Sequence, residues 1–260
     1  MLLLFFRFLA CPWYCLIAVL SETLEHISEY PPHAVKWPVM FQAWNRLTFL
    51  HWRYQPEAIR RLLPGGIELD TFDGTAWVGL TPFVLTGLRP PVLPAFPWIS
   101  RFPEMNVRTY VRGPRGERGI WFFSLEADRL AAVLGARLSY GLPYRWARMR
   151  VRFDSEKIEY ASRRHFGRGY AHAVIQPGSS IRPSERELFL TARFRLYTRL
   201  GGRLAFAQVE HPPWPLQSAT VLRLDQNVIE HSGVPPAIGE PLVHFTPGVY
   251  VRVGRPRFLD

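Results

Sequence analysis

The chain has 260 residues, 48% of them hydrophobic and only 20% charged, which excludes an intrinsically disordered protein and allows one β-rich domain or two small ones. Its net charge of +11 comes from basic residues that are all arginines except Lys36 and Lys157, and because these arginines are scattered we expect no nucleic-acid partner. Both cysteines, Cys11 and Cys15, lie near the start of the chain, which excludes a disulfide framework or a cysteine-bound metal in the folded region and favours a cytoplasmic location.

The first 20 residues, MLLLFFRFLACPWYCLIAVL, are apolar apart from Arg7. A membrane-spanning helix needs roughly 20 such residues, so residues 1–20 are a candidate membrane anchor. The alternative is that translation begins at Met40 and that residues 1–36 lie outside the domain. Both interpretations stay open, and we expect a membrane partner only under the first. We place one domain at residues 37–260.

The chain then predicts strands and short helices in its first half. Alternating polarity predicts a strand over residues 45–54, and Pro56 begins a short helix that ends before Pro64-Gly65. Residues 67–85 predict a hairpin with Asp73-Gly74 as its turn. A proline-rich loop follows at residues 89–98, and we expect it at the surface.

A strand over residues 102–113, FPEMNVRTYVRG, carries a polar row on one face. Period-two alternation places Glu104, Asn106, Arg108 and Tyr110 on that face and apolar side chains on the other. The turn GPRGERG leads to a pairing strand at residues 120–127. The row therefore faces either water or a polar cavity.

The second half continues the β-rich pattern. It predicts a helix from Asp128 to Gly141, a hairpin over residues 144–164, a strand at 171–178, a helix from the capping box of Ser184 and Glu187, a hairpin over 194–211 and a last strand at 249–256. We therefore expect an α+β, β-rich fold: one large curled antiparallel sheet with a few short helices.

The sequence lacks the common motifs of nucleotide, metal and hydrolase sites. There is no phosphate-binding glycine loop, dinucleotide fingerprint, HExxH pair or GxSxG elbow, and the eight histidines are dispersed. We expect neither a metal nor an organic cofactor. His211, in VEHPPWPLQ, is interpreted as part of a packing corner.

Several blocks, taken in order, resemble the YqjF-like family of domains of unknown function. They include LTFLHWRYQPEAIRRLLPGGIELDTFDGTAWVGLTPF, FPEMNVRTYVRG, GIWFFSLEA and VEHPPWPLQSA, and the resemblance covers nearly everything from Trp37 onward. The chain is more distantly similar to acetoacetate decarboxylase. That resemblance implies a cone or barrel of antiparallel strands around a buried cavity, with the row from Glu104 to Tyr110 pointing into it.

The Schiff-base chemistry of acetoacetate decarboxylase does not carry over. The resemblance would place the reactive lysine near YGLPYRW, where this chain has Pro143 and Tyr144. Arg145 and Arg148 are close, but a guanidinium stays protonated and cannot form the imine. Lys157 lies by a predicted turn and Lys36 precedes the domain. We therefore expect no Schiff-base decarboxylation.

The residues point to a small anionic organic molecule as the partner, bound and, if the protein is an enzyme, converted by proton transfer. Glu104 is the candidate acid or base, and Arg108 and Arg53 are the candidates for holding the negative charge. The other candidate cavity residues are Asn106, Tyr110 and His51. The alternative is a non-catalytic ligand-binding or structural protein in which the polar row forms a salt-bridge network centred on a Glu104–Arg108 pair.

Overall fold

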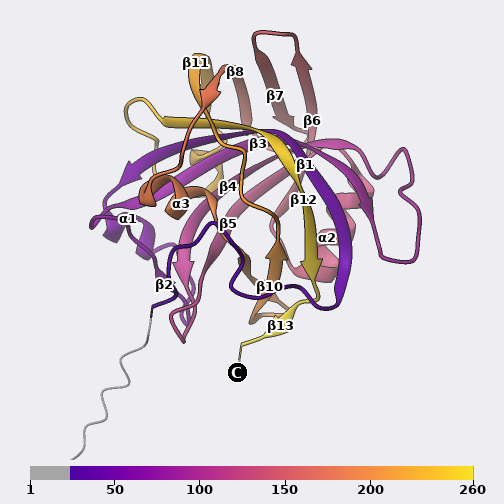
Figure 1. Ribbon diagram of the computed structural model, residues 1–260, viewed down its shortest axis with the longest axis vertical. Coiled ribbons are helices and arrows are strands. Elements are labelled where there is room, and N and C mark those ends of the chain that lie inside the picture. The colour runs from indigo at the N-terminus through magenta and orange to yellow at the C-terminus, as the bar shows by residue number, and fades with distance from the viewer. Residues whose placement is uncertain (1–23, 260) are drawn as a thin grey trace, which may run out of the picture.

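The computed structural model describes residues 24–259 and is dominated by β-strands (Figure 1). The first strands are β1 (Pro38–Tyr54), β2 (Glu68–Leu69), β3 (Ala76–Arg89), β4 (Phe102–Arg112), β5 (Arg118–Ala127), β6 (Tyr144–Phe153) and β7 (Ile158–Arg164). The later strands are β8 (Tyr170–Ser180), β9 (Arg195–Leu200), β10 (Arg203–Glu210), β11 (Gln217–Gln226), β12 (Leu242–Gly254) and β13 (Arg257–Phe258). The helices are α1 (Pro56–Arg60), α2 (Leu130–Tyr140), α3 (Glu185–Thr191) and the 3-10 turn η1 (Glu230–Ser232).

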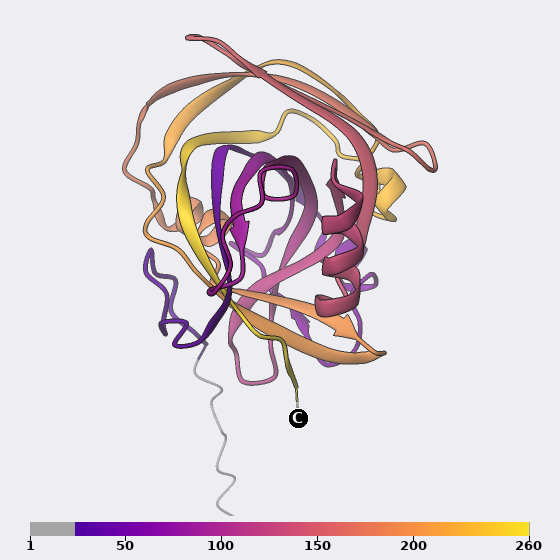
Figure 2. The ribbon, with the colours of Figure 1, turned by 90° about the vertical axis from the view of Figure 1, so that its right-hand side faces the viewer.

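Strand pairing closes the sheet into a barrel. Over residues 24–259, hydrogen-bonded neighbours form the nine-strand circuit β1-β3-β4-β5-β6-β7-β8-β11-β12 and back to β1. Two further pairings, β5 with β9 and β10 with β12, close a shorter circuit, β1-β3-β4-β5-β9-β10-β12. Figure 2 shows strands β7, β8 and β11 as an outer arc beyond this inner ring. The curled barrel expected from the sequence is confirmed, and its pairings are antiparallel except that β5 runs parallel to β6 and to β9.

The strands shared by both circuits separate two apolar cores. Along β4, Met105 and Val107 join the core that also contains Leu50 of β1 and Ile158 of β7. The opposite face of β4 begins at Phe102, which belongs to the core enclosed by the shorter circuit. Successive side chains of a strand point to opposite faces, so the alternation in FPEMNVRTYVRG supplies one wall to each core.

Helix α2 packs against the core of the shorter circuit through Val133 and Tyr140. It is capped at Gly141, whose φ of 66° is left-handed and whose added Cβ would clash with the Arg199 carbonyl oxygen. The predicted helix is therefore confirmed, with one difference at its start. Asp128 is not the N-cap, because its carboxylate instead accepts a hydrogen bond from the Met149 backbone.

One predicted hairpin is wrong in its pairing. The turn at Asp73-Gly74 forms, but only the Phe72–Thr75 bridge spans it, and β2 pairs with β4 instead of β3. Asp70 explains the difference: its backbone N–H donates to the Tyr110 carbonyl, and its buried carboxylate binds Arg118 and Arg193. The hairpins β4–β5, β6–β7 and β9–β10 and the capping box of α3 are as predicted. Strand β11 was not predicted.

Residues 24–36 pack on the barrel, although the sequence suggested a domain from Trp37. The Glu25 carboxylate accepts hydrogen bonds from the Arg118 backbone (2.6 Å) and from Arg195 Nη1 (2.9 Å). Val35 is buried, and its N–H donates to Glu210. These contacts make the segment part of the folded unit.

The candidate anchor, residues 1–20, lies outside the described residues. Within residues 24–259, every helix is too short or too polar to cross a membrane.

Candidate functional site

The shorter circuit encloses a cavity of about 430 Å³, which we call the barrel cavity. All seven of its strands contribute lining side chains, and α2 covers one side. Glu104, Asn106 and Arg108 line the barrel cavity and are nearly fully buried. Three of the four members of the predicted polar row therefore face this interior space and not water.

Arg108 is a buried cation without an acidic partner among the described residues. Its Nη2 donates to the Leu190 carbonyl at 3.4 Å, and its Nε has no hydrogen-bond partner. The guanidinium carbon lies 5.3 Å from the centre of the Phe49 ring. A buried charge normally has a counter-ion, so this arrangement favours an anion in the barrel cavity.

Glu104 is held in its neutral form. Burial raises its pKa to about 8, the nearby Glu126 adds to the rise, and the hydrogen bond from Tyr144 opposes it. The Tyr144 hydroxyl donates to Glu104 Oε2 at 2.9 Å. A carboxyl group with this pKa is mostly protonated at neutral pH, so it can donate a proton and does not repel an anion.

Tyr110 and His51 do not line the barrel cavity. Tyr110 lies at its Arg108 end, where both Tyr110 and Arg108 contact the Leu190 carbonyl of α3. The Tyr110 hydroxyl donates to the Leu190 carbonyl at 2.6 Å and accepts from His51 Nε2, also at 2.6 Å. A carbonyl can only accept, so His51 must carry its proton on Nε2. Burial and the nearby Arg108 lower the pKa of His51 well below its usual range, which keeps the ring neutral. We predicted that Tyr110 and His51 bind the ligand, but in the structure they lie outside the barrel cavity and hydrogen-bond to each other.

Arg53 lies away from the barrel cavity, contrary to our expectation. Its side chain is exposed, in a surface hollow beside Trp77 and Arg186. Strand β1 leaves the core at this point, so the face that buries Leu47 and Phe49 reaches solvent at Arg53. The second arginine at the barrel cavity is Arg193 instead.

Arg193, Tyr144 and His211 line the barrel cavity but were missed or assigned to packing. Arg193 binds Asp70 through Nη1 at 2.8 Å, and its Nη2 has no partner. His211 Nδ1 lies 2.8 Å from the Pro212 carbonyl and must carry the proton, while Nε2 has no partner. Burial lowers the pKa of His211 to about 4. His211 thus combines packing against Trp214 with an unused acceptor nitrogen.

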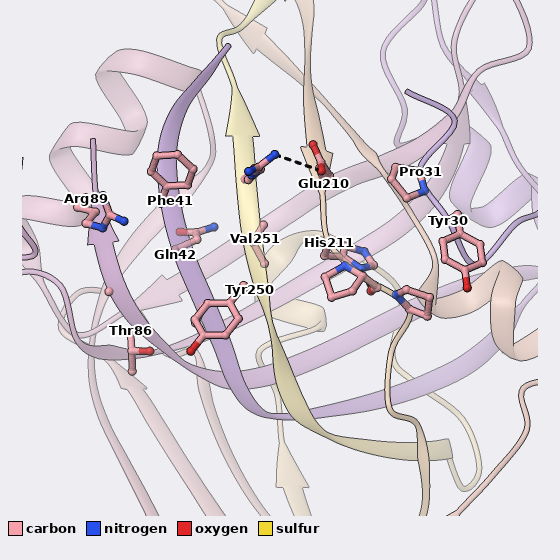
Figure 3. Close-up of a pocket in the computed structure, with 15 residues that line it drawn as sticks. Tyr30, Pro31, Phe41, Gln42, Thr86, Arg89, Glu210, His211, Tyr250 and Val251 are labelled. Carbon is pink, nitrogen blue, oxygen red and sulfur yellow. Dashed lines mark hydrogen bonds and ion pairs between the residues drawn. The ribbon is translucent and has the colours of Figure 1, made fainter. Parts of the chain in front are cut away.

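His211 also lines a second hollow, an outer groove bordered by Phe41, Tyr250 and Glu210 (Figure 3). Gln42 is the other residue shared with the barrel cavity. Glu210 pairs there with Arg252 at 3.6 Å, so the acid at this groove already has a cationic partner. The other cation at this groove, Arg89, is only half-buried and lies over the Phe41 ring, whereas the unpaired cation of the barrel cavity, Arg108, is buried.

The salt-bridge network considered for the polar row does not form. Over the described part of the chain, neither Glu104 nor Arg108 takes part in an ion pair. Buried ion pairs form elsewhere: Asp70 binds Arg118 at 2.5 Å and Arg193 at 2.8 Å, and Glu126 binds Arg164 at 2.5 Å. Glu104 and Arg108 therefore both line the barrel cavity without contacting each other.

Neither lysine of the chain reaches the barrel cavity. Lys157 is exposed at the β6–β7 turn and Lys36 is exposed before β1. Tyr144, which the resemblance placed near the lysine position of acetoacetate decarboxylase, is buried and bound to Glu104. In residues 24–259, no three His, Cys, Asp or Glu side chains gather closely enough to hold a metal ion.

Comparison with known proteins confirms both resemblances. Residues 41–250 match the model of DUF2071, described as an uncharacterised conserved protein. The chain is 39% identical over 211 residues to the uncharacterised protein YqjF of Bacillus subtilis (strain 168). The aligned region covers 80% of this chain and 87% of YqjF.

Solved structures of other proteins share the fold. The enduracididine biosynthesis enzyme MppR complexed with pyruvate aligns with a TM-score of 0.63 at 16% identity, covering 88% of this chain and 93% of MppR. Acetoacetate decarboxylase from Legionella pneumophila aligns with a TM-score of 0.59 at 15% identity, covering 90% of each chain. At such identities the likeness concerns architecture alone.

Proposed function

The chain belongs to the DUF2071 family of uncharacterised conserved proteins and has an acetoacetate decarboxylase-like fold, and from this premise we propose that it binds a small organic anion in the barrel cavity. The observation that carries the proposal is Arg108, a buried guanidinium at the barrel cavity with no acidic partner among the described residues. A carboxylate is the natural counter-ion, since its two oxygens match two N–H groups of a guanidinium.

The other polar groups support an anion. Glu104 and His211 are both neutral at pH 7, so neither adds a negative charge to the barrel cavity. Arg193 shares the Asp70 carboxylate with Arg118 and so has an acidic partner, whereas Arg108 has none among the described residues. The MppR structure holds pyruvate, so a small carboxylate is compatible with this architecture.

If the bound molecule is converted, Glu104 is the group placed to transfer the proton. Its protonated carboxyl lines the barrel cavity and is oriented by the Tyr144 hydroxyl. Proton transfer by a positioned side chain is efficient when its pKa lies near the working pH, which holds for a pKa of about 8. The proposal contains no imine step, because the described lysines lie outside the barrel cavity.

The test is ligand binding by the full chain and by Arg108→Met. We expect pyruvate, acetoacetate or 3-hydroxybutyrate to raise the melting temperature of the wild type, because a ligand of the native state alone stabilises it. In Arg108→Met, loss of one charge-assisted contact should weaken binding of that acid by about 10- to 100-fold, measured by calorimetry. Sodium chloride at equal ionic strength controls for a salt effect.

Arg195→Met is the matched control variant. Arg195 is also buried, but it pairs with Glu25 and lies outside the barrel cavity. It should lower stability without changing affinity for the acid. Equal loss of binding in both variants, or no binding by any acid to the wild type, would reject the anion site.

A further inference from the structure

The barrel cavity has two chemically different ends. Its side chains from β4 run from Phe102 to Arg108, which spans about 20 Å for six residues of extended strand. The Arg108 end is closed by α3, whose Leu190 carbonyl accepts from Arg108 and Tyr110. At the other end, the lining residues Ile99, Ala131, Gly135 and Ser139 are exposed. The barrel cavity therefore opens between α2 and the loop before β4.

The space between these ends is mostly apolar. Hydrophobic lining residues come from every side of the ring, among them Leu47, Phe83, Leu85, Phe122, Leu125 and Leu196. On the α2 side the lining side chains other than Tyr140 are small, and Ala132 and Ala136 among them face the same core. Small residues there leave room, and the apolar walls favour hydrocarbon over water.

The spacing of the polar groups sets a length for the ligand. Glu104 and Arg108 are four residues apart on one strand, about 13 Å between their Cα atoms. They form no ion pair, and Arg108 is not among the groups that shift the pKa of Glu104. A carboxylate held by Arg108 on a three- or four-carbon acid would leave the apolar part of the barrel cavity empty.

We propose that the ligand is an elongated amphiphilic monocarboxylate. Its carboxylate binds Arg108 at the closed end, and its hydrocarbon chain runs past Glu104 towards α2. This inference rests on the proposed anion site and adds the substrate class. A medium-chain acid fits both features, because it carries one charge for Arg108 and an apolar body for the walls.

A chain-length series tests the inference on the full chain. Isothermal titration with butanoate, hexanoate and octanoate should show affinity rising about three- to fourfold per added methylene, until the chain reaches the opening. Octan-1-ol has the same tail without the charge, and we expect it to bind at least about tenfold more weakly than octanoate.

Two α2 variants locate the tail. Gly135→Leu adds a side chain where a new Cβ meets nothing within 4 Å, so the variant should fold. Ala136→Leu narrows the same end from the core side. Both variants should bind octanoate about tenfold or more weakly than the wild type and bind butanoate with nearly unchanged affinity. Leu138→Ala, on the exposed face of α2 and away from the barrel cavity, should change neither.

The outcomes separate the two proposals. If butanoate binds as tightly as octanoate, or if the α2 variants affect both acids equally, the elongated ligand is rejected and the anion site stands. If octanol binds as tightly as octanoate, or if Arg108→Met binds octanoate like the wild type, the anion site fails and this inference fails with it.

Discussion

Glu104 shows how a single side chain acquires its chemistry from burial. An ordinary glutamate is ionised at neutral pH, but desolvation in the barrel cavity raises the pKa of this one to about 8. Tyr144 donates to one carboxylate oxygen and partly opposes that rise. The same position therefore offers a neutral proton donor, in the cavity that Arg108 also lines, at the pH where most enzymes work.

The raised pKa predicts a specific pH dependence of stability. Between pH 5 and pH 8 the unfolded chain has Glu104 ionised while the folded chain keeps it protonated, so the folded state binds more protons. The free energy of unfolding should therefore fall as pH rises, by up to ~1.4 kcal/mol per pH unit from this group. Glu104→Gln should lack this component in denaturant titrations.

The comparison isolates Glu104 from the other buried groups. His51 and His211, whose pKa values are lowered by burial, contribute equally to the wild type and the variant. Glu156→Gln, at an exposed position, should follow the wild type. Parallel stability curves for wild type and Glu104→Gln across this range would mean that Glu104 ionises normally.

At the scale of elements, Asp70 holds together segments that are distant in sequence. It follows β2, and its carboxylate binds Arg118 at the start of β5 and Arg193 after α3. All three side chains are largely buried, so each charge depends on the others for compensation. This contact explains why β2 lies against β4 and not against β3.

Asp70→Asn should therefore be strongly destabilising. It keeps the shape but leaves two buried guanidinium groups without a counter-ion, which typically costs about 3–5 kcal/mol. Glu68→Gln is the matched control, because Glu68 lies two residues earlier, is exposed and pairs with Arg112 at 3.1 Å. Loss of that surface pair should cost less than about 1 kcal/mol. Similar unfolding free energies for both variants would contradict this assignment.

At the scale of the whole molecule, the barrel is completed by contacts from outside the strands. The segment before β1 brings Glu25 to Arg195 and Val35 to Glu210. Helix α2 crosses from β5 to β6 and covers the barrel cavity. The segment before β1 and helix α2 both link strands that pair with each other over a short length. Strands β5 and β9, for example, pair through only two residue pairs in the described part of the chain.

A chain that begins at Met40 should fold but be less stable than the full chain. It loses the Glu25 carboxylate, which leaves the buried Arg195 without its counter-ion, and we expect a loss of ~3 kcal/mol. Thermal unfolding of the full chain, the Met40 chain and full-length Glu25→Gln measures this. Equal melting temperatures for all three would show that residues 24–36 contribute nothing to the fold.

The sequence by itself determined the local pattern. The alternation around Glu104, Asn106 and Arg108 placed these side chains on one face of a strand, and the sequence composition and turns indicated a β-rich fold. The scarcity of lysine removed Schiff-base chemistry from consideration. These features depend on neighbouring residues, and the two-residue period of a strand is visible in any short stretch.

The tertiary structure alone decided which side chains meet. Arg193, Tyr144 and His211 reach the barrel cavity from β-strand ends and loops up to about a hundred residues from Glu104 in sequence, whereas Arg53, on a strand face with buried neighbours, reaches solvent. The pairing of β2 with β4 and the closure of the ring likewise join distant segments. Local sequence periodicity does not indicate such contacts, because they depend on packing and on buried charges that come together only when the whole chain is folded.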